Sequence, residues 1–229
     1  MKILNLIDGR PVPASSGRTL EVFEPATGKV YATAPDSGPE DVNEAVAAAG
    51  RAFAGWSGRS AAERSDVLRR LADLIEANLD RLAEAESRDN GKPVSLARAV
   101  DIPRSAANLR FFATAILHSA GEFHDFDGGG VPGGVPAINY TLRKPRGVAG
   151  CISPWNLPLY LFTWKIAPAL ASGCTVVGKP SEVTPATAAM LGELSIEAGL
   201  PPGVLNIVHG TGTGAGAPLV QHADVSTIT

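Results

Sequence analysis

Three segments in the second half of the chain combine residue types that can bind and polarise a small molecule. Each follows a short apolar run, and they read ISPWNLP (residues 152–158), KPSE (residues 179–182) and GTGTGAG (residues 210–216). The side-chain amide of Asn156 can donate to the oxyanion that develops when a carbonyl carbon is attacked. Lys179 and Glu182 have the spacing to meet ribose hydroxyls, and the missing side chains of the glycine run let a dinucleotide approach the backbone.

Each segment taken alone also has a simpler interpretation. Asn156 can cap a helix, and Lys179 with Glu182 can form a solvated ion pair. The glycine run contains GxGxG but not a full GxGxxG, and it follows the third apolar run of its series rather than the first, so it can merely turn the chain. The occurrence of all three segments together, rather than any one of them, favours a cofactor site.

A regular alternation of strands and helices begins at residue 148 and must position these segments. Apolar runs predict strands at residues 148–153, 175–179, 204–208 and 225–229, and helical periodicity predicts helices at residues 159–171, 185–198 and 215–221. Elements that alternate at these lengths form right-handed βαβ units around a parallel sheet, whose ligands bind at the carboxyl ends of the strands. Because such a sheet usually has more strands, we expect the chain to be part of a longer protein.

Residues 1–147 follow a different pattern. Turn pairs separate short apolar runs at residues 3–7, 20–23 and 30–32 and predict hairpins. Helical spacing begins at Pro39 and again at Ser60, whose distance from Glu63 predicts a capping box, and a further helix is expected over residues 101–119. The glycine-rich residues 127–134 predict a boundary or a mobile connection, and a strand is expected at residues 138–143.

Composition and charge restrict the kinds of partner. The net charge of −3 and the absence of a long Lys/Arg run argue against a nucleic acid or an anionic membrane as the main partner. The most apolar stretch, residues 157–170, is interrupted by Lys165 and is too short to span a bilayer, and charges interrupt the N-terminal residues too early for a signal peptide. Cys151 and Cys174 are isolated in apolar surroundings, which predicts reduced thiols and no metal site. We therefore expect a cytoplasmic protein that acts on a small molecule.

Longer stretches of the sequence resemble the aldehyde dehydrogenase superfamily. They are GVAGCISPWNLPLYLFTWKIAPALASGCTVVGKPSEVTPATA and EAGLPPGVLNIVHGTG in the second half, and FEPATGKVYATAPDSGPEDVNEAVAAA, FAGWS and RSAAERSDVLRRLADLI in the first. The resemblance therefore covers nearly the whole chain. The combination of DIPRSAANLRFFA, SPWNLPLYL and KPSEVTP is most similar to the 2-aminomuconic and 2-hydroxymuconic semialdehyde dehydrogenase group.

The resemblance implies an incomplete α/β fold with a Rossmann-like parallel sheet of the aldehyde dehydrogenase type. Residues 1–129 would form hairpins and helices that pack on the cofactor domain, residues 130–147 a loop and a bridging strand, and residues 148–229 the first part of the NAD-binding domain. The catalytic domain would be absent from this chain. The strand at residues 138–143 resembles the arm through which family members pair across subunits, so a homo-oligomer is expected.

The resemblance also implies an activity, namely the oxidation of an aldehyde to an acid through a thiohemiacetal and a thioester on a cysteine, with hydride transfer to NAD. By position, Asn156 would donate to the thiohemiacetal oxyanion, and Lys179 and Glu182 would hold the adenosine ribose. Glu182 suits the 2′-hydroxyl of NAD better than the 2′-phosphate of NADP, whereas Ser181 tolerates either cofactor. The remaining cofactor contacts would come from Ile152, Ser153, Pro154 and Trp155, and from Gly212 and Gly216 on the adenine side.

Two sets of residues are candidates for substrate binding. Leu157, Leu161 and Trp164 fall on one face of the helix beside Asn156, where they would line an aldehyde tunnel or, alternatively, belong to the ordinary core. Arg104 would bind the carboxylate of an acidic semialdehyde, or it would form an exposed salt bridge.

The family's nucleophilic cysteine and general-base glutamate would lie downstream of Thr229. Neither Cys151 nor Cys174 has a cationic neighbour in the sequence that would make it a substitute, so we expect this chain alone not to oxidise aldehydes. Two rival hypotheses stay open. One is a different nicotinamide oxidoreductase, which would need a phosphate loop where this chain has SPWN, and the other is a non-catalytic fragment that keeps the cofactor-domain fold.

Overall fold

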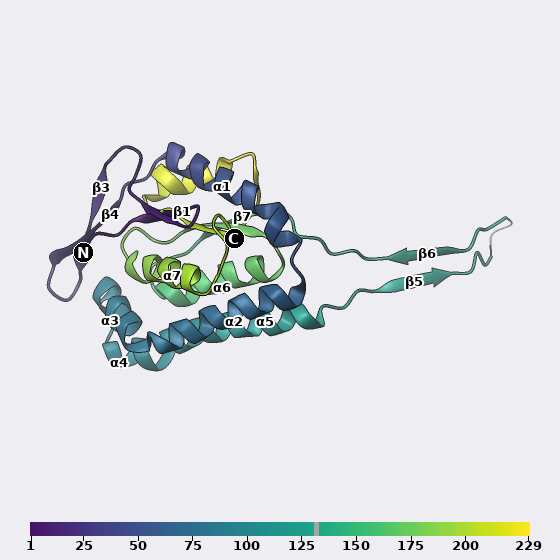
Figure 1. The fold of residues 1–229 in the computed structure, drawn as a ribbon, viewed down its shortest axis with the longest axis horizontal. Coiled ribbons are helices and arrows are strands. Elements are labelled where there is room, and N and C mark those ends of the chain that lie inside the picture. The colour runs from purple at the N-terminus through teal and green to yellow at the C-terminus, as the bar shows by residue number, and fades with distance from the viewer. Residues whose placement is uncertain (131–132) are drawn as a thin grey trace.

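A six-stranded sheet runs through the middle of the molecule, and helices cover both of its faces (Figure 1). The computed structural model describes residues 1–130 and 133–229. The spatial order of the strands is β10-β7-β8-β9-β1-β2, and the first four of these run parallel. The bounds are β7 (Val148–Ile152), α6 (Pro158–Ala171), β8 (Thr175–Lys179), α7 (Ala186–Glu197), β9 (Leu205–Ile207), α8 (Ala217–Gln221) and β10 (Val225–Ile228). The predicted parallel sheet and its intervening helices are confirmed.

The N-terminal hairpins were predicted, but one of them extends the main sheet. Strand β1 (Asn5–Ile7) pairs antiparallel with β9 and with β2 (Arg10–Val12). All three residues of β1 are buried, as expected for a strand that has a neighbouring strand on each side. A second hairpin, β3 (Thr19–Glu24) with β4 (Lys29–Pro35), forms a sheet of its own.

Three helices follow the hairpins: α1 (Pro39–Ser57), α2 (Ala61–Ala77) and α3 (Leu79–Asn90). The predicted capping box is present, because the Glu63 backbone N–H donates to Ser60 Oγ at 3.2 Å and the Ser60 backbone N–H donates to Glu63 Oε2 at 2.8 Å. Helix α3 ends where Gly91 adopts φ of 78°, a left-handed conformation that favours glycine. The helical region therefore closes at the Asn90-Gly91 pair.

The next helical stretch begins earlier than predicted. It runs through α4 (Val94–Leu96), a π-helical turn η1 (Ala97–Asp101), α5 (Ile102–Ala115) and the 3-10 turn η2 (Ile116–His118). The expected start at residue 101 was wrong because the wider η1 turn accommodates Pro103: the Ile102 backbone N–H bonds to Ala97 O, and Pro103 has no N–H to bond.

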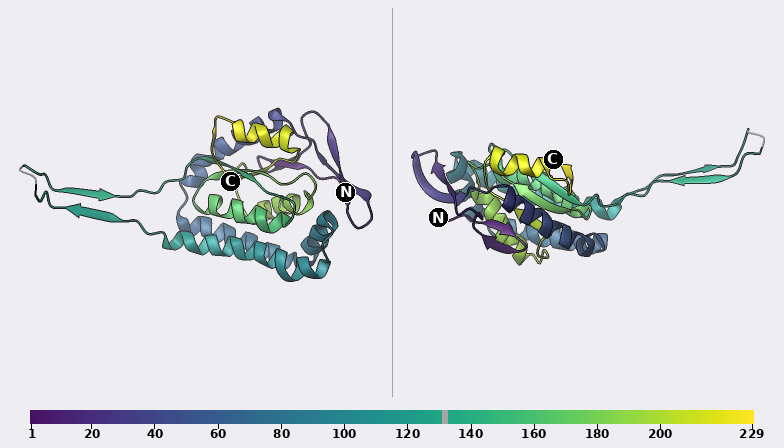
Figure 2. Two further views of the ribbon diagram at one scale, coloured as in Figure 1. Left: turned by 180° about the vertical axis from the view of Figure 1, so that it is seen from behind. Right: turned by 90° about the horizontal axis from the view of Figure 1, so that it is seen from above.

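The helices form layers on the sheet. Figures 1 and 2 show α1 and α8 on one face and α6 and α7 on the other, with α2 and α5 packed outside α6. Gly178 in β8 lets the ring of Phe162 lie directly on the strand, because a Cβ at this position would be 2.5 Å from Phe162 Cζ. This close packing fixes α6, and with it the loop that precedes α6. Among the described residues, no helix has the length and apolar character needed to cross a membrane.

A long hairpin extends away from the rest of the molecule (Figures 1 and 2). It consists of β5 (Phe123–Phe126) paired antiparallel with β6 (Ala137–Tyr140), and every residue of both strands is exposed. The sequence predicted a strand at residues 138–143 but not β5. It also predicted a boundary or mobile connection at residues 127–134. Of these, residues 127–130 and 133–134 connect the two paired strands, and residues 131 and 132 lie outside the described residues.

Candidate functional site

A cavity of about 420 Å³ opens at the carboxyl ends of β7 and β8 and at the start of α8. Of the nine residues predicted to bind a cofactor, all except Trp155 line this cavity. Those eight are Ile152, Ser153, Pro154, Lys179, Ser181, Glu182, Gly212 and Gly216. The parallel sheet brings them together because each group follows the carboxyl end of its own strand.

Lys179 and Glu182 form an ion pair in the wall of the cavity. The Lys179 ammonium donates to Glu182 Oε2 at 3.1 Å and to the carbonyl of Pro180 at 2.8 Å, and its side chain is 3% exposed. An ammonium has three N–H groups, so one remains for a hydroxyl of a ligand. The pair is therefore partly buried beside a cavity, unlike the solvated pair that was the simpler interpretation.

The charge of Glu182 is stabilised by its surroundings. Burial raises the pKa of its carboxyl, but its own backbone N–H, the Lys179 ammonium and the Gly212 N–H outweigh burial and hold the pKa below its usual range. A carboxylate that accepts hydrogen bonds and is ionised at neutral pH can receive two hydroxyls of a ribose.

Two further features show that the cavity has room and polarity for a nucleotide. The Ser153 hydroxyl is buried and has no hydrogen-bond partner among the described residues, so a ligand in the cavity would satisfy it. A Cβ at Gly212 would meet no protein atom within 4 Å, and a Cβ at Gly216 would lie 3.5 Å from Lys179 Cδ. The glycines thus leave space that side chains would fill, and this donor set fits a dinucleotide.

The glycine run differs from the expected loop. Residues Gly212–Gly216 form a π-helical turn (η3) that leads into α8, and Thr211 caps it by accepting the Gly214 N–H at 2.9 Å. Ala217, Val220 and Gln221 of α8 also line the cavity, although the sequence did not predict them. Their spacing of three and four residues, directly after the glycine run, is the signal that identifies this helix face.

Trp155 is the one predicted cofactor residue that the structure directs elsewhere. Its side chain is 62% exposed and lines a separate hollow of about 280 Å³ together with Phe23 of β3, Val183 and other residues. The loop after β7 thus turns the indole toward the N-terminal hairpin and away from the cofactor cavity.

Asn156 lies on the same loop and does not cap α6. The N-cap residue of α6 is Leu157, whose side chain cannot accept a hydrogen bond. The Leu159 backbone N–H in the first turn donates instead to Glu86 Oε2 at 3.4 Å. The Asn156 side chain is exposed, with no hydrogen-bond partner among the described residues, while its carbonyl accepts hydrogen bonds from Asn90 and Lys92. Its amide is therefore free to donate to a bound group, although Asn156 does not line the cofactor cavity itself.

The predicted substrate residues lie on an open surface formed by α5 and α6. Leu157 and Leu161 are half-buried and Trp164 is 50% exposed, so these three are not ordinary core residues. Arg104 stacks at 4.2 Å over the ring of Tyr160 and donates to its hydroxyl at 2.8 Å. No carboxylate among the described residues pairs with Arg104, so the alternative of an exposed salt bridge does not describe its surroundings.

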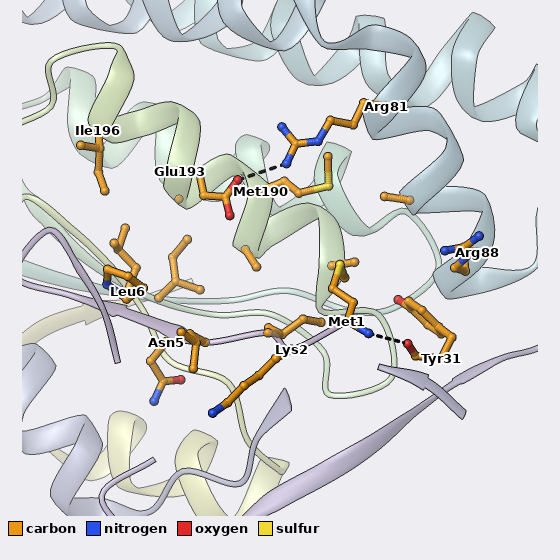
Figure 3. Close-up of a pocket in the computed structure, with 18 of the residues that line it drawn as sticks. Met1, Lys2, Asn5, Leu6, Tyr31, Arg81, Arg88, Met190, Glu193 and Ile196 are labelled. Carbon is orange, nitrogen blue, oxygen red and sulfur yellow. Dashed lines mark hydrogen bonds and ion pairs between the residues drawn. The ribbon is translucent and has the colours of Figure 1, made fainter. Parts of the chain in front are cut away.

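A second cavity, of about 390 Å³, lies between β1, α3 and α7 (Figure 3). Two of its charged groups have protein partners: Arg81 pairs with Glu193 at 3.2 Å, and the N-terminal ammonium of Met1 donates to Tyr31 O at 2.9 Å. None of the predicted site residues lines it. Apart from Trp155, the predicted cofactor-binding residues gather at the sheet edge and not in this cavity.

The two cysteines are unsuited to nucleophilic catalysis. Cys151 and Cys174 are both buried, and burial raises the pKa of the Cys151 thiol to about 12. A thiol in that state carries almost no thiolate at neutral pH.

Comparison with known proteins identifies the family. The model of the aldehyde dehydrogenase family matches residues 12–229. This chain belongs to the aldehyde dehydrogenase family. It is 56% identical to the 2-aminomuconic semialdehyde dehydrogenase of Danio rerio over 98% of the chain and 44% of that protein. It is 50% identical to the 2-hydroxymuconic semialdehyde dehydrogenase of Pseudomonas sp. (strain CF600) over 100% of the chain and 47% of that protein.

Solved structures of the family agree with this fold. The structure of PnpE from Pseudomonas sp. WBC-3 in complex with nicotinamide adenine dinucleotide matches with a TM-score of 0.92 and 43% identity, over 100% of this chain and 45% of that one. The chain thus spans less than half the length of each of these three relatives. The predicted resemblance to the muconic semialdehyde dehydrogenases within this family, and the incomplete cofactor-domain fold, are confirmed.

Proposed function

We propose that this chain supplies the NAD site and the oxyanion-stabilising amide of an enzyme that oxidises an aldehyde to an acid. One observation carries the proposal: residues from three strand ends, Ser153, Lys179, Glu182 and the Gly212–Gly216 turn, line a single cavity that has unused hydrogen-bonding capacity. The membership in the aldehyde dehydrogenase family supports the reaction type.

NAD is the proposed cofactor, with NADP disfavoured. The ionised Glu182 would repel the 2′-phosphate of NADP and accept hydrogen bonds from the ribose hydroxyls of NAD, and the free N–H of Lys179 would donate to the same ribose. The relative PnpE, whose structure contains nicotinamide adenine dinucleotide, supports this choice. When bound, NAD would supply the hydride acceptor for the oxidation, while Lys179 and Glu182 would hold its adenosine ribose.

Asn156 is proposed to stabilise the oxyanion that forms when a thiolate attacks the aldehyde. Its exposed amide has donors to spare, and a fixed amide donor lowers the energy of developing charge without reorganising. The thiolate would come from a residue outside this chain, because both cysteines here are buried. This chain alone is therefore proposed to be inactive towards aldehydes.

The substrate is proposed to be an aldehyde that carries a carboxylate. Arg104 holds its guanidinium on the surface over Tyr160, whose ring contacts Trp164, and has no carboxylate partner among the described residues. The names of two relatives, a 2-aminomuconic and a 2-hydroxymuconic semialdehyde dehydrogenase, support an acidic semialdehyde. Leu157, Leu161 and Trp164 would form the apolar wall of the path to Asn156.

We propose that the chain is organised into the three parts that its sequence predicts. Residues 148–229 would be the first part of the NAD-binding domain, residues 1–129 would pack on it, and residues 130–147 would bridge to another subunit. The exposed apolar side chains of the β5–β6 hairpin, such as Phe123 at 68% and Ile138 at 68% exposure, support an arm that a second subunit covers.

Calorimetric titration of the chain with NAD tests the proposed cofactor site. The chain should bind NAD, and Lys179→Met should weaken binding by about tenfold or more, since a hydrogen bond to a charged group contributes about 1.5–3 kcal/mol. Arg81→Met is the matched control, because this cation forms an exposed ion pair beside the other cavity. Failure of the chain to bind NAD, or equal binding by Lys179→Met, would reject the site.

A further inference from the structure

A buried cluster of charged side chains, which the proposed reaction does not use, lies against the loop that carries Asn156. It consists of Glu86 near the end of α3, Lys92 just after α3, and Asp101 at the end of η1. Their side chains are 0%, 10% and 3% exposed. Lys92 Nζ lies 3.7 Å from Glu86 Oε1 and forms a closer ion pair with Asp101.

The cluster holds both ends of the segment from Asn156 to Leu159. At one end, the Asn156 carbonyl oxygen lies 3.5 Å from Lys92 Nζ and 3.3 Å from Asn90 Nδ2, and both donate to it. At the other end, Glu86 Oε2 accepts the Leu159 backbone N–H at 3.4 Å and the Thr187 hydroxyl at 3.0 Å. The contacts reach the backbone of the loop and leave the Asn156 side chain free.

Burial of three charges is costly unless each charge keeps its partners. The pKa of the Glu86 carboxyl is raised to about 7, chiefly by burial and also by Asp101, although Lys92, Thr187 and the Leu159 N–H oppose the rise. The ammonium of Lys92 therefore has three acceptors around it, namely two carboxylates and the Asn156 carbonyl. If the ammonium moved away, all three acceptors would lose this buried cation. The nearby Arg98–Asp80 pair differs, because its side chains are 58% and 70% exposed and such pairs contribute little.

We propose that Lys92, with Asn90, is a positioning residue that fixes the Asn156 carbonyl and thereby the direction in which the Asn156 amide donates. An amide that stabilises an oxyanion must be held within a fraction of an ångström. Contacts to the backbone carbonyl of the same residue fix the main chain from which its side chain extends. This inference rests on the proposed role of Asn156.

A double-mutant cycle in the full-length enzyme that carries this chain tests the proposal. Lys92→Met should lower kcat by about tenfold and leave KM for NAD within about twofold, because a small misplacement of a catalytic group is costly while Lys92 lies outside the cofactor cavity. In the Asn156→Ala background, Lys92→Met should change kcat by less than about twofold, because coupled residues are not additive. Arg98→Met, which removes a nearby cation in η1 from an exposed pair, should change neither parameter.

Asn90→Ala is the second variant, since it removes one donor to the Asn156 carbonyl and no charge. It should fold like the parent chain and lower kcat by about threefold, again only when Asn156 is present. An equal loss of kcat in both backgrounds would mean that Lys92 and Asn90 act only on stability, and would overturn the proposal, as would an unchanged kcat. If Asn156→Ala itself leaves kcat unchanged, the proposed function fails, and the positioning role with it; NAD binding by the chain remains a separate measurement.

Discussion

The loops after β7 and β8 lie side by side at one sheet edge, yet they are held in place in different ways. After β8, Lys179 and Glu182 are three residues apart and bond to each other, so the local sequence builds that wall of the cavity. After β7, the Asn156 side chain is exposed, and its loop is held through its carbonyl by Asn90 and Lys92 from the distant α3 region. The cofactor side is therefore built locally, whereas the oxyanion side depends on the N-terminal helices.

The two loops also differ in the buried titratable group that lies near each of them, because one group has a lowered pKa and the other a raised pKa. Near Lys179, burial and the Lys179 charge lower the pKa of His209 to about 3, so the imidazole is neutral at every physiological pH. Near Asn156, burial raises the pKa of Glu86 to about 7. The two regions should therefore respond to acid in opposite directions, and the variants below separate them.

The largest effect is expected from Asn156→Ala in the full-length enzyme. Loss of one oxyanion donor should lower kcat by about 10²–10³-fold, with KM for NAD nearly unchanged because Asn156 lies outside the cofactor cavity. Steady-state kinetics combined with a single-turnover measurement would establish that chemistry limits the rate. An unchanged rate of the chemical step would remove the functional difference between the two loops.

Removal of the Arg104 guanidinium should have a smaller and more selective effect. Arg104→Leu should lower kcat/KM for a carboxylate-bearing aldehyde by about 10–100-fold, the usual loss for a charge-assisted hydrogen bond, and change kcat/KM for a neutral aldehyde by less than about twofold. Arg110→Leu is the control, since Arg110 lies on the same helix but is paired with Asp73 and Glu76. Equal losses for both aldehydes would argue that Arg104 only supports Tyr160.

Most of the βαβ region could be predicted from the sequence because local pattern and tertiary role agree there. Buried strands such as β7 are continuous apolar runs, and the polar segments follow their carboxyl ends, so the cavity lining was predictable. The hairpin strand β5 was not predictable, because all four of its residues are exposed and no buried face imposes an alternation. The early start of the helix before Pro103 depends on a π-helical turn, which has no pattern of its own in the sequence.

The parts of the site that escaped prediction depend on side-chain direction across long distances. Trp155 belongs to the same short segment as Ser153, yet it lies toward β3. The backbone that follows it is held by Asn90, Lys92 and Glu86, which are distant in the sequence. Lys92 lies in Asn90-Gly91-Lys92-Pro93, which has the composition of an exposed turn, and only the fold reveals its two buried carboxylates.

The opposite acid responses can be tested through stability. The unfolded pKa of His209 is near 6.5 and its folded pKa is about 3, so the stability that it contributes is full above pH 6.5 and is lost as the pH falls. His209→Leu removes this loss. Its unfolding free energy relative to the parent chain should rise by about 2 kcal/mol between pH 6.5 and pH 5, at about 1.4 kcal/mol per pH unit.

Urea unfolding at several pH values measures this difference, with His124→Leu on the exposed hairpin as the control. Glu86 has the reverse sign: its folded pKa is about 7, so the stability that it contributes is full below pH 4.5 and is lost as the pH rises towards 7. Glu86→Gln should remove that decline. A pH-independent difference between His209→Leu and the parent chain would show that the imidazole is not held neutral.

The smallest effect is expected from Glu182→Gln, which should change the ratio of the Kd values of NAD and NADP. Glu182→Gln keeps the size of the side chain and removes the charge that repels a 2′-phosphate, but it also weakens acceptance of the ribose hydroxyls. NAD should bind about tenfold more weakly, and NADP should bind as well as before or better, so the ratio of the two Kd values should narrow by about tenfold or more. Calorimetry with both cofactors measures the ratio, and Glu193→Gln in the exposed pair with Arg81 is the matched control. A constant ratio would mean that the Glu182 charge serves Lys179 alone, and that the locally built wall of the cavity does not select the cofactor.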